Sequence, residues 1–346
     1  MRTVAAVLVE PGRPLAFEEL EIPSLAPGQT LVEIAYSGVC HTQVLECRGH
    51  RGADRFLPHC LGHEGTGIVR DVGPGTTKVR AGDSVLLSWI KGSGRDVPAT
   101  VYRQGDRRVN AGAITTFAQL AVVSENRLTP LAAKTPLREA TVLGCALPTG
   151  AGAVLNAARA RPGDSLAVFG TGGVGLCAIA AAALAGCTPV IAIDVRPEKL
   201  VLAAELGATH CVNAADDDPL AAIGRIIRGG LDVAIEATGR PDVMLQALAS
   251  VRPRGGTAIV IGNARHGERV AIDPWELNCG KRLLGTWGGD TDPDRDFPRY
   301  ARLLASGRLP LGRLLSRPYR LAEVDRALDD LEAGTVARPL IDPRMS

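Results

Sequence analysis

The chain contains 346 residues, of which 46% are hydrophobic and 22% are charged, and this composition predicts a soluble protein with room for two domains. A formal net charge of +2 gives no general attraction to nucleic acid or to an anionic membrane surface. No apolar run reaches the length of a membrane span, so composition and charge together predict neither nucleic acid nor membrane as a partner.

The first predicted elements are short strands. From Met1 to about Arg127, apolar or alternating runs are separated by turns rich in proline and glycine, which predicts a β-rich, barrel-like domain. The opening run is broken early by Pro11, so we interpret it as a strand and not as a signal peptide. Residues 90–112 are polar and contain glycines, and they predict a long irregular loop that is either functional or simply solvated.

The segment 38–67 carries the first candidate chemistry. Cys40 directly follows a strand-like run, and His63 and Glu64 lie together in GHEGTG. A thiolate, an imidazole and a carboxylate suit a zinc ion, although a buried structural cysteine and a hydrogen-bonded histidine explain the same letters. The pattern does not single out a third ligand among the other cysteines.

The remaining cysteines form neither a CxxC pair nor an even ladder. This spacing favours reduced thiols and a cytoplasmic protein. The eight cysteines stand at positions 40, 47, 60, 145, 177, 187, 211 and 279.

After residue 137 the pattern changes. Residues 137–160 are predicted to be helical, with an interruption at 147–150. A buried strand at 165–170, an alanine-rich helix to about residue 185 and a strand at 189–195 then form the start of a βαβ series, which predicts a parallel sheet.

A glycine motif joins the first strand of this series to its helix. Gly170 allows the tight turn, Gly172 allows the backbone to approach a pyrophosphate, and Gly175 allows the helix to pack on the strand. Asp194 ends the next strand, where an acid binds the ribose hydroxyls and repels a 2′-phosphate, so NAD is favoured over NADP. Arg196 could accommodate that phosphate, and a plain glycine turn with a capping aspartate is the alternative interpretation.

The order of these motifs resembles the medium-chain, zinc-containing alcohol dehydrogenase family. The matching pieces are GVCHT, GHEGTGIV, GCALPTGAG, GTGGVG, AIDV and EATG, and the resemblance extends over essentially the whole chain. It implies an α/β fold in which a GroES-like β-barrel catalytic domain, residues 1–147 and 288–346, contains an inserted Rossmann-type NAD-binding domain, residues 148–287.

The resemblance also implies the residues of the metal site. Cys40, His63 and Cys145 would be the ligands of one catalytic zinc. Thr42 would hydrogen-bond the substrate oxygen and begin a proton relay, and Glu64 would be a carboxylate beside the metal.

Two further sets of residues follow from the same resemblance, together with a homodimeric or homotetrameric assembly. The substrate pocket would include Trp89 and Asn110. The cofactor would be contacted by His41, Thr149, Gly170, Gly172, Gly173, Val174, Gly175, Asp194, Lys199, Thr238 and Arg338.

This chain departs from the family in ways that affect these predictions. Residues 90–112 contain no cysteine, so we expect no structural zinc. Gln43 replaces an acid that hydrogen-bonds the zinc-ligating histidine, and Leu45 stands where some members carry a relay histidine.

The function predicted from the sequence is a zinc-dependent alcohol dehydrogenase that uses NAD. Asn110 and the polar segment 91–108 favour a secondary or polyhydroxylated alcohol such as a sugar, polyol or aminocyclitol. Alternatives are an enzyme for simple aliphatic or benzylic primary alcohols, a zinc-free reductase, and a non-catalytic dinucleotide-binding relative.

Overall fold

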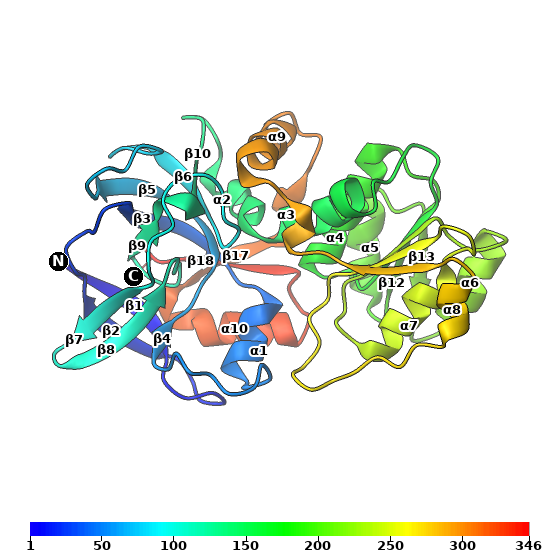
Figure 1. Cartoon of the computed structure of the whole chain (residues 1–346), viewed down its shortest axis with the longest axis horizontal. Coiled ribbons are helices and arrows are strands. Elements are labelled where there is room, and N and C mark those ends of the chain that lie inside the picture. Colours follow the sequence, from blue (N-terminus) through cyan, green and yellow to red (C-terminus); the bar gives the residue numbers. More distant parts are fainter. Residues whose placement is uncertain (346) are drawn as a thin grey trace. The chain divides into compact units, whose positions relative to one another are not determined.

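The computed structural model describes residues 1–345 and divides into two compact units (Figure 1). The barrel unit comprises Met1–Cys145 and the segment from Asp292 to the C-terminus, and the parallel-sheet unit comprises Ala146–Thr291. The α/β class predicted from the sequence is confirmed, whereas the domain boundaries at 147/148 and 287/288 stay a prediction.

The barrel unit contains a closed barrel with the strand order β1-β2-β7-β8-β4. Its interior is filled by the inward residues of each strand, among them Val7, Leu20, Tyr102 and Val109. The strands are β1 (Arg2–Leu8), β2 (Ala16–Glu21), β4 (His59–Cys60), β7 (Thr100–Gln104) and β8 (Arg107–Gly112).

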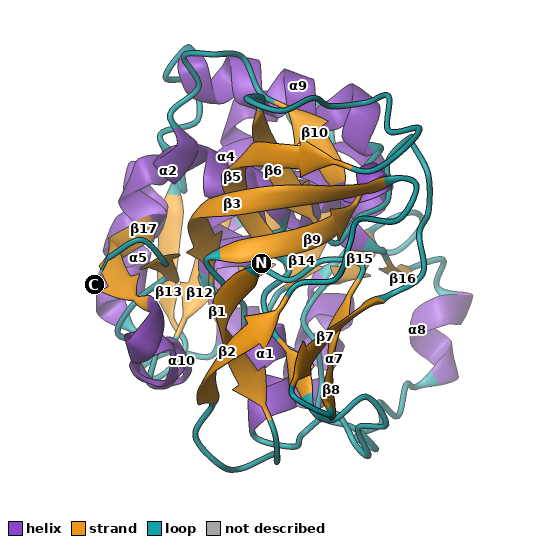
Figure 2. Cartoon of the chain, turned by 90° about the vertical axis from the view of Figure 1, so that its left-hand side faces the viewer, coloured by secondary structure: helices purple, strands orange, loops and turns teal. Residues whose placement is uncertain are grey.

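A second sheet of the same unit has the order β10-β6-β5-β3-β18-β17, with β9 also paired to β3. Figure 2 shows β3, β5, β6 and β9 lying side by side. The strands are β3 (Gln29–Gly38), β5 (Glu64–Val72), β6 (Ser84–Ser88), β9 (Leu120–Ser124), β10 (Leu128–Pro130), β17 (Leu315–Arg320) and β18 (Arg338–Asp342). Because β18 pairs antiparallel with the end of β3, the C-terminal segment lies beside the strand that leads to Cys40.

Short helices complete the barrel unit. Helices α1 and α10 pack together, and Val44 and Leu328 belong to one buried cluster between them. The helices are α1 (His41–Cys47), α2 (Leu137–Ala140), α9 (Pro293–Ala305) and α10 (Val324–Glu332), with single turns η1 (Glu125–Arg127), η2 (Thr141–Gly144), η5 (Leu311–Leu314) and η6 (Leu321–Glu323).

Two expectations about irregular and helical segments were wrong. Residues 90–112 are not one irregular loop, because their second half is the β7–β8 hairpin, whose strands close the barrel. The helical stretch 137–160 is interrupted at Cys145, with φ −151° and ψ −63°, and not at 147–150. A β-carbon at Gly144 would lie 2.5 Å from the carbonyl oxygen of Leu87, so the residue before this break packs closely on β6.

The parallel-sheet unit has six parallel strands in the order β13-β12-β11-β14-β15-β16. The central strands are buried on both faces, as expected for a parallel sheet covered by helices. The strands are β11 (Leu166–Phe169), β12 (Val190–Asp194), β13 (His210–Asn213), β14 (Val233–Glu236), β15 (Thr257–Val260) and β16 (Arg282–Gly285).

Helix α4 is almost entirely buried, because its small side chains let neighbouring elements approach closely. A β-carbon at Gly150 of α3 would lie 2.3 Å from the carbonyl oxygen of Val174. The helices of this unit are α3 (Ala146–Gly152), η3 (Ala153–Ala157), α4 (Gly173–Ala185), α5 (Pro197–Glu205), α6 (Pro219–Ile226), α7 (Pro241–Ser250), α8 (Pro274–Asn278) and η4 (Gly288–Asp290). Within residues 1–345, no single helix is long and apolar enough to cross a membrane.

Candidate active site

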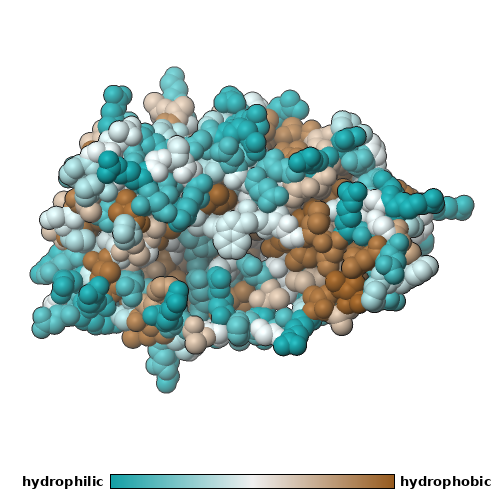
Figure 3. Space-filling model, viewed as in Figure 1, coloured by the Kyte–Doolittle hydropathy of each residue, from teal (hydrophilic) through white to brown (hydrophobic). Residues whose placement is uncertain are grey.

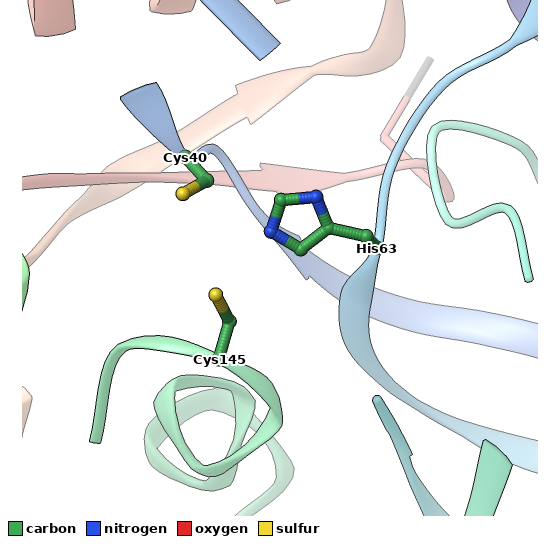
Figure 4. A group of neighbouring side chains, drawn as sticks. All are labelled: Cys40, His63 and Cys145. Atoms are coloured by element: carbon green, nitrogen blue, oxygen red, sulfur yellow. The ribbon is translucent and has the colours of Figure 1, made fainter. Parts of the chain in front are cut away.

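Three potential metal ligands converge in the barrel unit (Figure 4). Cys40 is the N-cap of α1, His63 directly precedes β5, and Cys145 follows η2. One ligand atom from each residue lies within 4.8 Å of the others. Figure 4 shows the two sulfur atoms and one ring nitrogen of His63 pointing toward a common centre.

The donor set and its surroundings fit a zinc ion. The Nε2 atom of His63 is buried and has no hydrogen-bond partner, which is unfavourable unless a metal or another group satisfies it. Two sulfurs and an imidazole nitrogen are typical zinc ligands, and both cysteines are less than 10% exposed. Among the described residues, this is the one cluster of histidine, cysteine or acidic groups with such geometry.

The two thiols differ in acidity. A hydrogen bond from Cys145 lowers the pKa of Cys40 well below its usual value, against the effect of burial and with help from the positive charge of Arg338. Donation of that hydrogen bond, together with burial, raises the pKa of Cys145.

Gln43 connects the first two ligands. Its Oε1 accepts the backbone N–H of Cys40 at 2.6 Å, and its Nε2 lies 3.3 Å from Nδ1 of His63. Because a backbone N–H can only donate, the nearer amide atom must be the oxygen. The amide therefore presents its NH₂ group to the histidine.

Glu64 and Arg338 form a buried ion pair behind the metal ligands. Arg338 Nε donates to Glu64 Oε1 at 2.7 Å, and the side chains of Arg338 and Glu64 are 3% and 0% exposed. Burial raises the pKa of Glu64, while Arg338 opposes this shift. A β-carbon at Gly38 would lie 1.8 Å from Glu64 Oε1, so glycine is required there to leave space for the carboxylate.

The other predicted residues of the barrel unit occupy different environments. Thr42 lies in the first turn of α1, with its Oγ1 3.8 Å from Cys40 Sγ, and His41 is exposed at the start of the same helix. The indole Nε1 of Trp89 donates to Cys145 Sγ at 3.3 Å. Asn110 lies on β8, where its amide donates to the carbonyl of Phe56 at 2.6 Å. Thr42 and Trp89 thus lie beside the potential metal ligands, whereas the amide of Asn110 hydrogen-bonds within the barrel unit.

The glycine motif of the parallel-sheet unit borders a cavity of about 320 Å³. Gly170 has φ +92°, which favours glycine, and Gly172 is the N-cap of α4. A β-carbon at Gly175 would lie 1.9 Å from the carbonyl oxygen of Gly170, so this glycine permits the close approach of helix and strand. Gly170, Asp194 and Thr238 line the cavity, and Gly173 and Val174 form the first turn of α4.

Asp194 is fixed against the glycine turn. Its Oδ2 accepts the backbone N–H of Thr171 at 2.7 Å and the hydroxyl of that residue at 2.9 Å. Its Oδ1 accepts the backbone N–H of Arg196 at 3.1 Å. The carboxylate is thereby held at the end of β12, on the wall of the cavity.

Three other residues predicted to contact the cofactor, Thr149, Lys199 and Arg338, are not among the residues that line this cavity. Thr149 is on α3, and its buried hydroxyl oxygen has no hydrogen-bond partner. Lys199 lies on α5 and is not among the residues that line the cavity. Arg338 is engaged with Glu64 inside the barrel unit. The roles of these residues toward a cofactor remain predictions.

Sequence reasoning missed several features of both sites. It named Glu64 and Arg338 separately but did not pair them, because 274 positions separate them. It also missed Arg240, which lines the cavity and forms a two-contact ion pair with Asp242. The position of Arg240 and Asp242 at the start of α7, a few residues after β14 ends, was the available signal, since ligands bind at the carboxyl ends of parallel strands.

Comparison with known proteins gives two family matches. Residues 26–133 match the alcohol dehydrogenase GroES-like domain, and residues 173–306 match the zinc-binding dehydrogenase domain. The first match lies in the barrel unit, and the second covers most of the parallel-sheet unit.

Individual relatives match over nearly the full length. An S-(hydroxymethyl)glutathione dehydrogenase from Synechocystis sp. is 32% identical, with 99% of this chain and 100% of the relative covered. Two crystal structures match over 99% of both chains. An alcohol dehydrogenase zinc-binding domain protein from Burkholderia ambifaria has 32% identity and a TM-score of 0.91. Benzyl alcohol dehydrogenase from Acinetobacter calcoaceticus has 30% identity and a TM-score of 0.90.

Proposed function

The chain belongs to the medium-chain, zinc-containing alcohol dehydrogenase family, and we propose that it oxidises a primary alcohol, with NAD as the hydride acceptor. The observation that carries this proposal is the convergence of Cys40, His63 and Cys145 around a centre that the unpartnered Nε2 of His63 faces. Two sulfurs and one imidazole leave one position of a tetrahedral zinc open, which is typical of catalytic sites.

The metal and the cofactor would each supply a defined part of the chemistry. A zinc ion held by Cys40, His63 and Cys145 would act as a Lewis acid that lowers the pKa of the alcohol hydroxyl. NAD in the cavity beside Gly170 would accept the hydride. We propose one catalytic zinc per chain and no structural zinc.

The residues of the chain would provide proton transfer and electrostatic support. The hydroxyl of Thr42, in the first turn of α1, would accept the alcohol proton. Leu45 is 5% exposed and carries no titratable group, so the proton must leave Thr42 without it. Arg338 would favour the charged form of the Glu64 carboxyl, against the effect of burial on its pKa, through the ion pair between the two side chains.

Preference for NAD over NADP is supported by the charges at the cavity. The carboxylate of Asp194 would accept hydrogen bonds from ribose hydroxyls and repel a 2′-phosphate. Arg240 lines the same cavity, but Asp242 balances its charge through contacts of 3.1 and 2.9 Å. A lower kcat/KM with NADP than with NAD is expected.

The choice of substrate class rests on the side chains near the metal ligands. The amide of Asn110 donates to the carbonyl of Phe56, which weakens the sequence-based preference for a polyhydroxylated alcohol. Trp89 supplies an apolar aromatic surface beside Cys145. Two of the relatives reported above, S-(hydroxymethyl)glutathione dehydrogenase and benzyl alcohol dehydrogenase, are named for compounds with a CH₂–OH group. These points support a primary alcohol, benzylic or aliphatic, and a secondary or polyhydroxylated alcohol is the second candidate.

Assembly into a homodimer or homotetramer is part of the proposal. β16 is an edge strand with no second neighbour among the described residues, and such an edge can pair with another chain. Exposed apolar side chains lie on this strand and on the helix before it: Leu284 of β16 is 43% exposed, and Trp275 of α8 is 69% exposed. On the face of the molecule that Figure 3 shows, the largest hydrophobic area lies over the parallel-sheet unit. Light scattering should give a mass of two or four chains.

The proposed function is tested by following NADH formation with zinc-loaded protein. One panel contains benzylic and aliphatic primary alcohols, and the other contains polyols, sugars and aminocyclitols. We expect turnover with the first panel, about one zinc per chain by elemental analysis, and loss of turnover in Cys145→Ser with NADH binding retained.

Each result has a separate meaning. Turnover only with the second panel would replace the primary-alcohol proposal with the polyhydroxylated one. Full activity of a zinc-free Cys145→Ser variant would overturn the metal-dependent mechanism. NADH binding without turnover on either panel would favour a non-catalytic dinucleotide-binding protein.

A further inference from the structure

The indole of Trp89 touches a metal ligand. Its Nε1 donates to Cys145 Sγ at 3.3 Å, within the range of hydrogen bonds to sulfur. Trp89 directly follows β6, whereas Cys145 lies more than fifty residues later, after η2. The family resemblance placed Trp89 only in the substrate pocket, so the contact with Cys145 gives this residue a second possible role.

The neighbours of both residues fix this contact. The hydroxyl of Ser88 donates to the carbonyl of Gly144 at 2.6 Å, and this bond connects the positions directly before Trp89 and Cys145. The guanidinium of Arg127 donates to the backbone carbonyl of Trp89. At Gly144 a β-carbon would lie only 2.5 Å from the carbonyl oxygen of Leu87, so β6 and η2 are in close contact. The distance between the indole and the sulfur is therefore set by packed backbone.

A hydrogen bond to a thiolate changes how the sulfur binds a metal. An N–H group aimed at a charged sulfur stabilises its negative charge and reduces the electron density available to a bound cation. The two sulfurs of this site have different neighbours. Cys145 Sγ accepts a hydrogen bond from the Trp89 indole at 3.3 Å, whereas Cys40 Sγ lies 3.8 Å from the hydroxyl oxygen of Thr42.

We propose that Trp89 is a positioning residue of the metal centre: its indole N–H holds the Cys145 thiolate in place and tunes its donation to the metal. This inference rests on the proposed metal-dependent function. Trp89 would then have two roles: its N–H group binds the Cys145 sulfur, and its ring presents an apolar surface to a substrate.

The test replaces zinc with Co²⁺ and compares the parent protein with Trp89→Phe, which keeps an aromatic ring and removes the N–H. Because the thiolate of the variant donates more strongly, its sulfur-to-cobalt charge-transfer band is expected at longer wavelength. The variant also loses the group that holds the thiolate in place, and this loss should outweigh the stronger donation and weaken zinc binding about tenfold in competition with a chromophoric chelator. Trp275→Phe is the matched control, since Trp275 is 69% exposed on α8, and its band should not move.

The outcomes separate this inference from the proposed function. Absence of any charge-transfer band in the cobalt-loaded parent would overturn the metal centre itself. If Trp89→Phe shows the same band position and the same zinc affinity as the parent, the role of Trp89 is overturned and the metal centre is left intact.

A second measurement uses the parent protein, so it does not depend on the folding of a variant. The chain has three tryptophans, and their indole N–H signals can be compared in ¹⁵N-labelled protein. With ¹¹³Cd bound, the Trp89 indole proton should be shifted downfield from the other two and show scalar coupling to cadmium through the sulfur. Absence of both the shift and the coupling would overturn the proposed hydrogen bond.

Discussion

At the scale of single residues, Gln43 sets the proton arrangement of His63. A histidine that binds a metal through Nε2 carries its proton on Nδ1 and needs an acceptor there. The Oε1 of Gln43 is already committed to the backbone N–H of Cys40, so the amide offers a donor to Nδ1 instead. This arrangement favours a proton on Nε2, the atom that must bind zinc.

Gln43→Glu should therefore tighten zinc binding about 10-fold or more, because a carboxylate accepts hydrogen bonds from both Cys40 and His63. Competition with a chromophoric chelator measures the change. Gln104→Glu, which adds the same charge on the exposed end of β7, is the control and should leave the affinity unchanged. An unchanged affinity in Gln43→Glu would show that the amide does not limit metal binding.

The buried pair of Glu64 and Arg338 makes the second prediction at this scale. Arg338→Met leaves the Glu64 carboxylate buried without its partner, and the free energy of unfolding should fall by about 3–5 kcal/mol. Urea denaturation measures it. The double variant Glu64→Gln with Arg338→Met removes both charges and should recover most of the loss. A double variant as unstable as the single one would mean that packing, and not charge, explains the effect.

At the scale of elements, two helices illustrate when a glycine is required. Gly175 lies in α4, where a β-carbon would meet the carbonyl oxygen of Gly170 at 1.9 Å. Gly224 lies in α6, where a β-carbon would meet no atom within 4 Å. Both positions are helical, so the intrinsic preference for alanine is the same and only the surroundings differ.

Gly175→Ala should destabilise the protein by about 1–3 kcal/mol and weaken NADH binding, because the helix must move away from the turn that borders the cavity. Gly224→Ala should be neutral or stabilising by up to about 1 kcal/mol. Thermal unfolding and NADH fluorescence titration check both. Equal effects of the two substitutions would contradict the packing explanation.

At the scale of the whole molecule, long-range polar contacts hold segments that hydrophobic packing does not reach. The carboxylate of Glu125, which is 1% exposed, accepts the backbone N–H groups of Thr77 and Lys78 at 2.6 Å and of Arg95 at 3.0 Å. Asp294 of α9 accepts the backbone N–H of Ser93 and pairs with Lys78. Two carboxylates thereby anchor the segment 91–97, in which no cysteine is available to bind a structural zinc.

Glu125 should make the stability depend on pH. Burial raises the pKa of this carboxyl, but the backbone donors of Arg95, Lys78 and Thr77 outweigh burial and lower the pKa below its ordinary value. A lowered pKa in the folded state means that the stabilisation is complete above the unfolded-state pKa of about 4.3 and is lost as pH falls through the folded value.

Glu125→Gln should therefore cost about 1–3 kcal/mol at pH 7, and the difference from the parent should shrink below about pH 4. Urea denaturation at several pH values measures this difference. A difference that is constant from pH 7 to pH 3 would exclude the charged carboxylate as its source.

Local sequence patterns predicted the elements whose determinants are close together in the chain. The βαβ order, the turn at Gly170 and the acid at the end of β12 follow from strand and helix periodicity and from the backbone freedom of glycine. The hairpin at 100–112 was missed, because its polar, charged strands are stabilised by closing the barrel and not by their own hydrophobic pattern.

The sequence by itself determined the two-part architecture and the identity of the chemical groups: two thiols, an imidazole, a glycine turn and an aspartate. Only the tertiary structure decided which of these groups meet. Cys145 reaches Cys40 because Gly144 packs against β6, and Arg338 reaches Glu64 because β18 pairs with β3. Such contacts join segments tens to hundreds of residues apart, and their geometry depends on sheet register and close packing, which no local pattern of residues encodes.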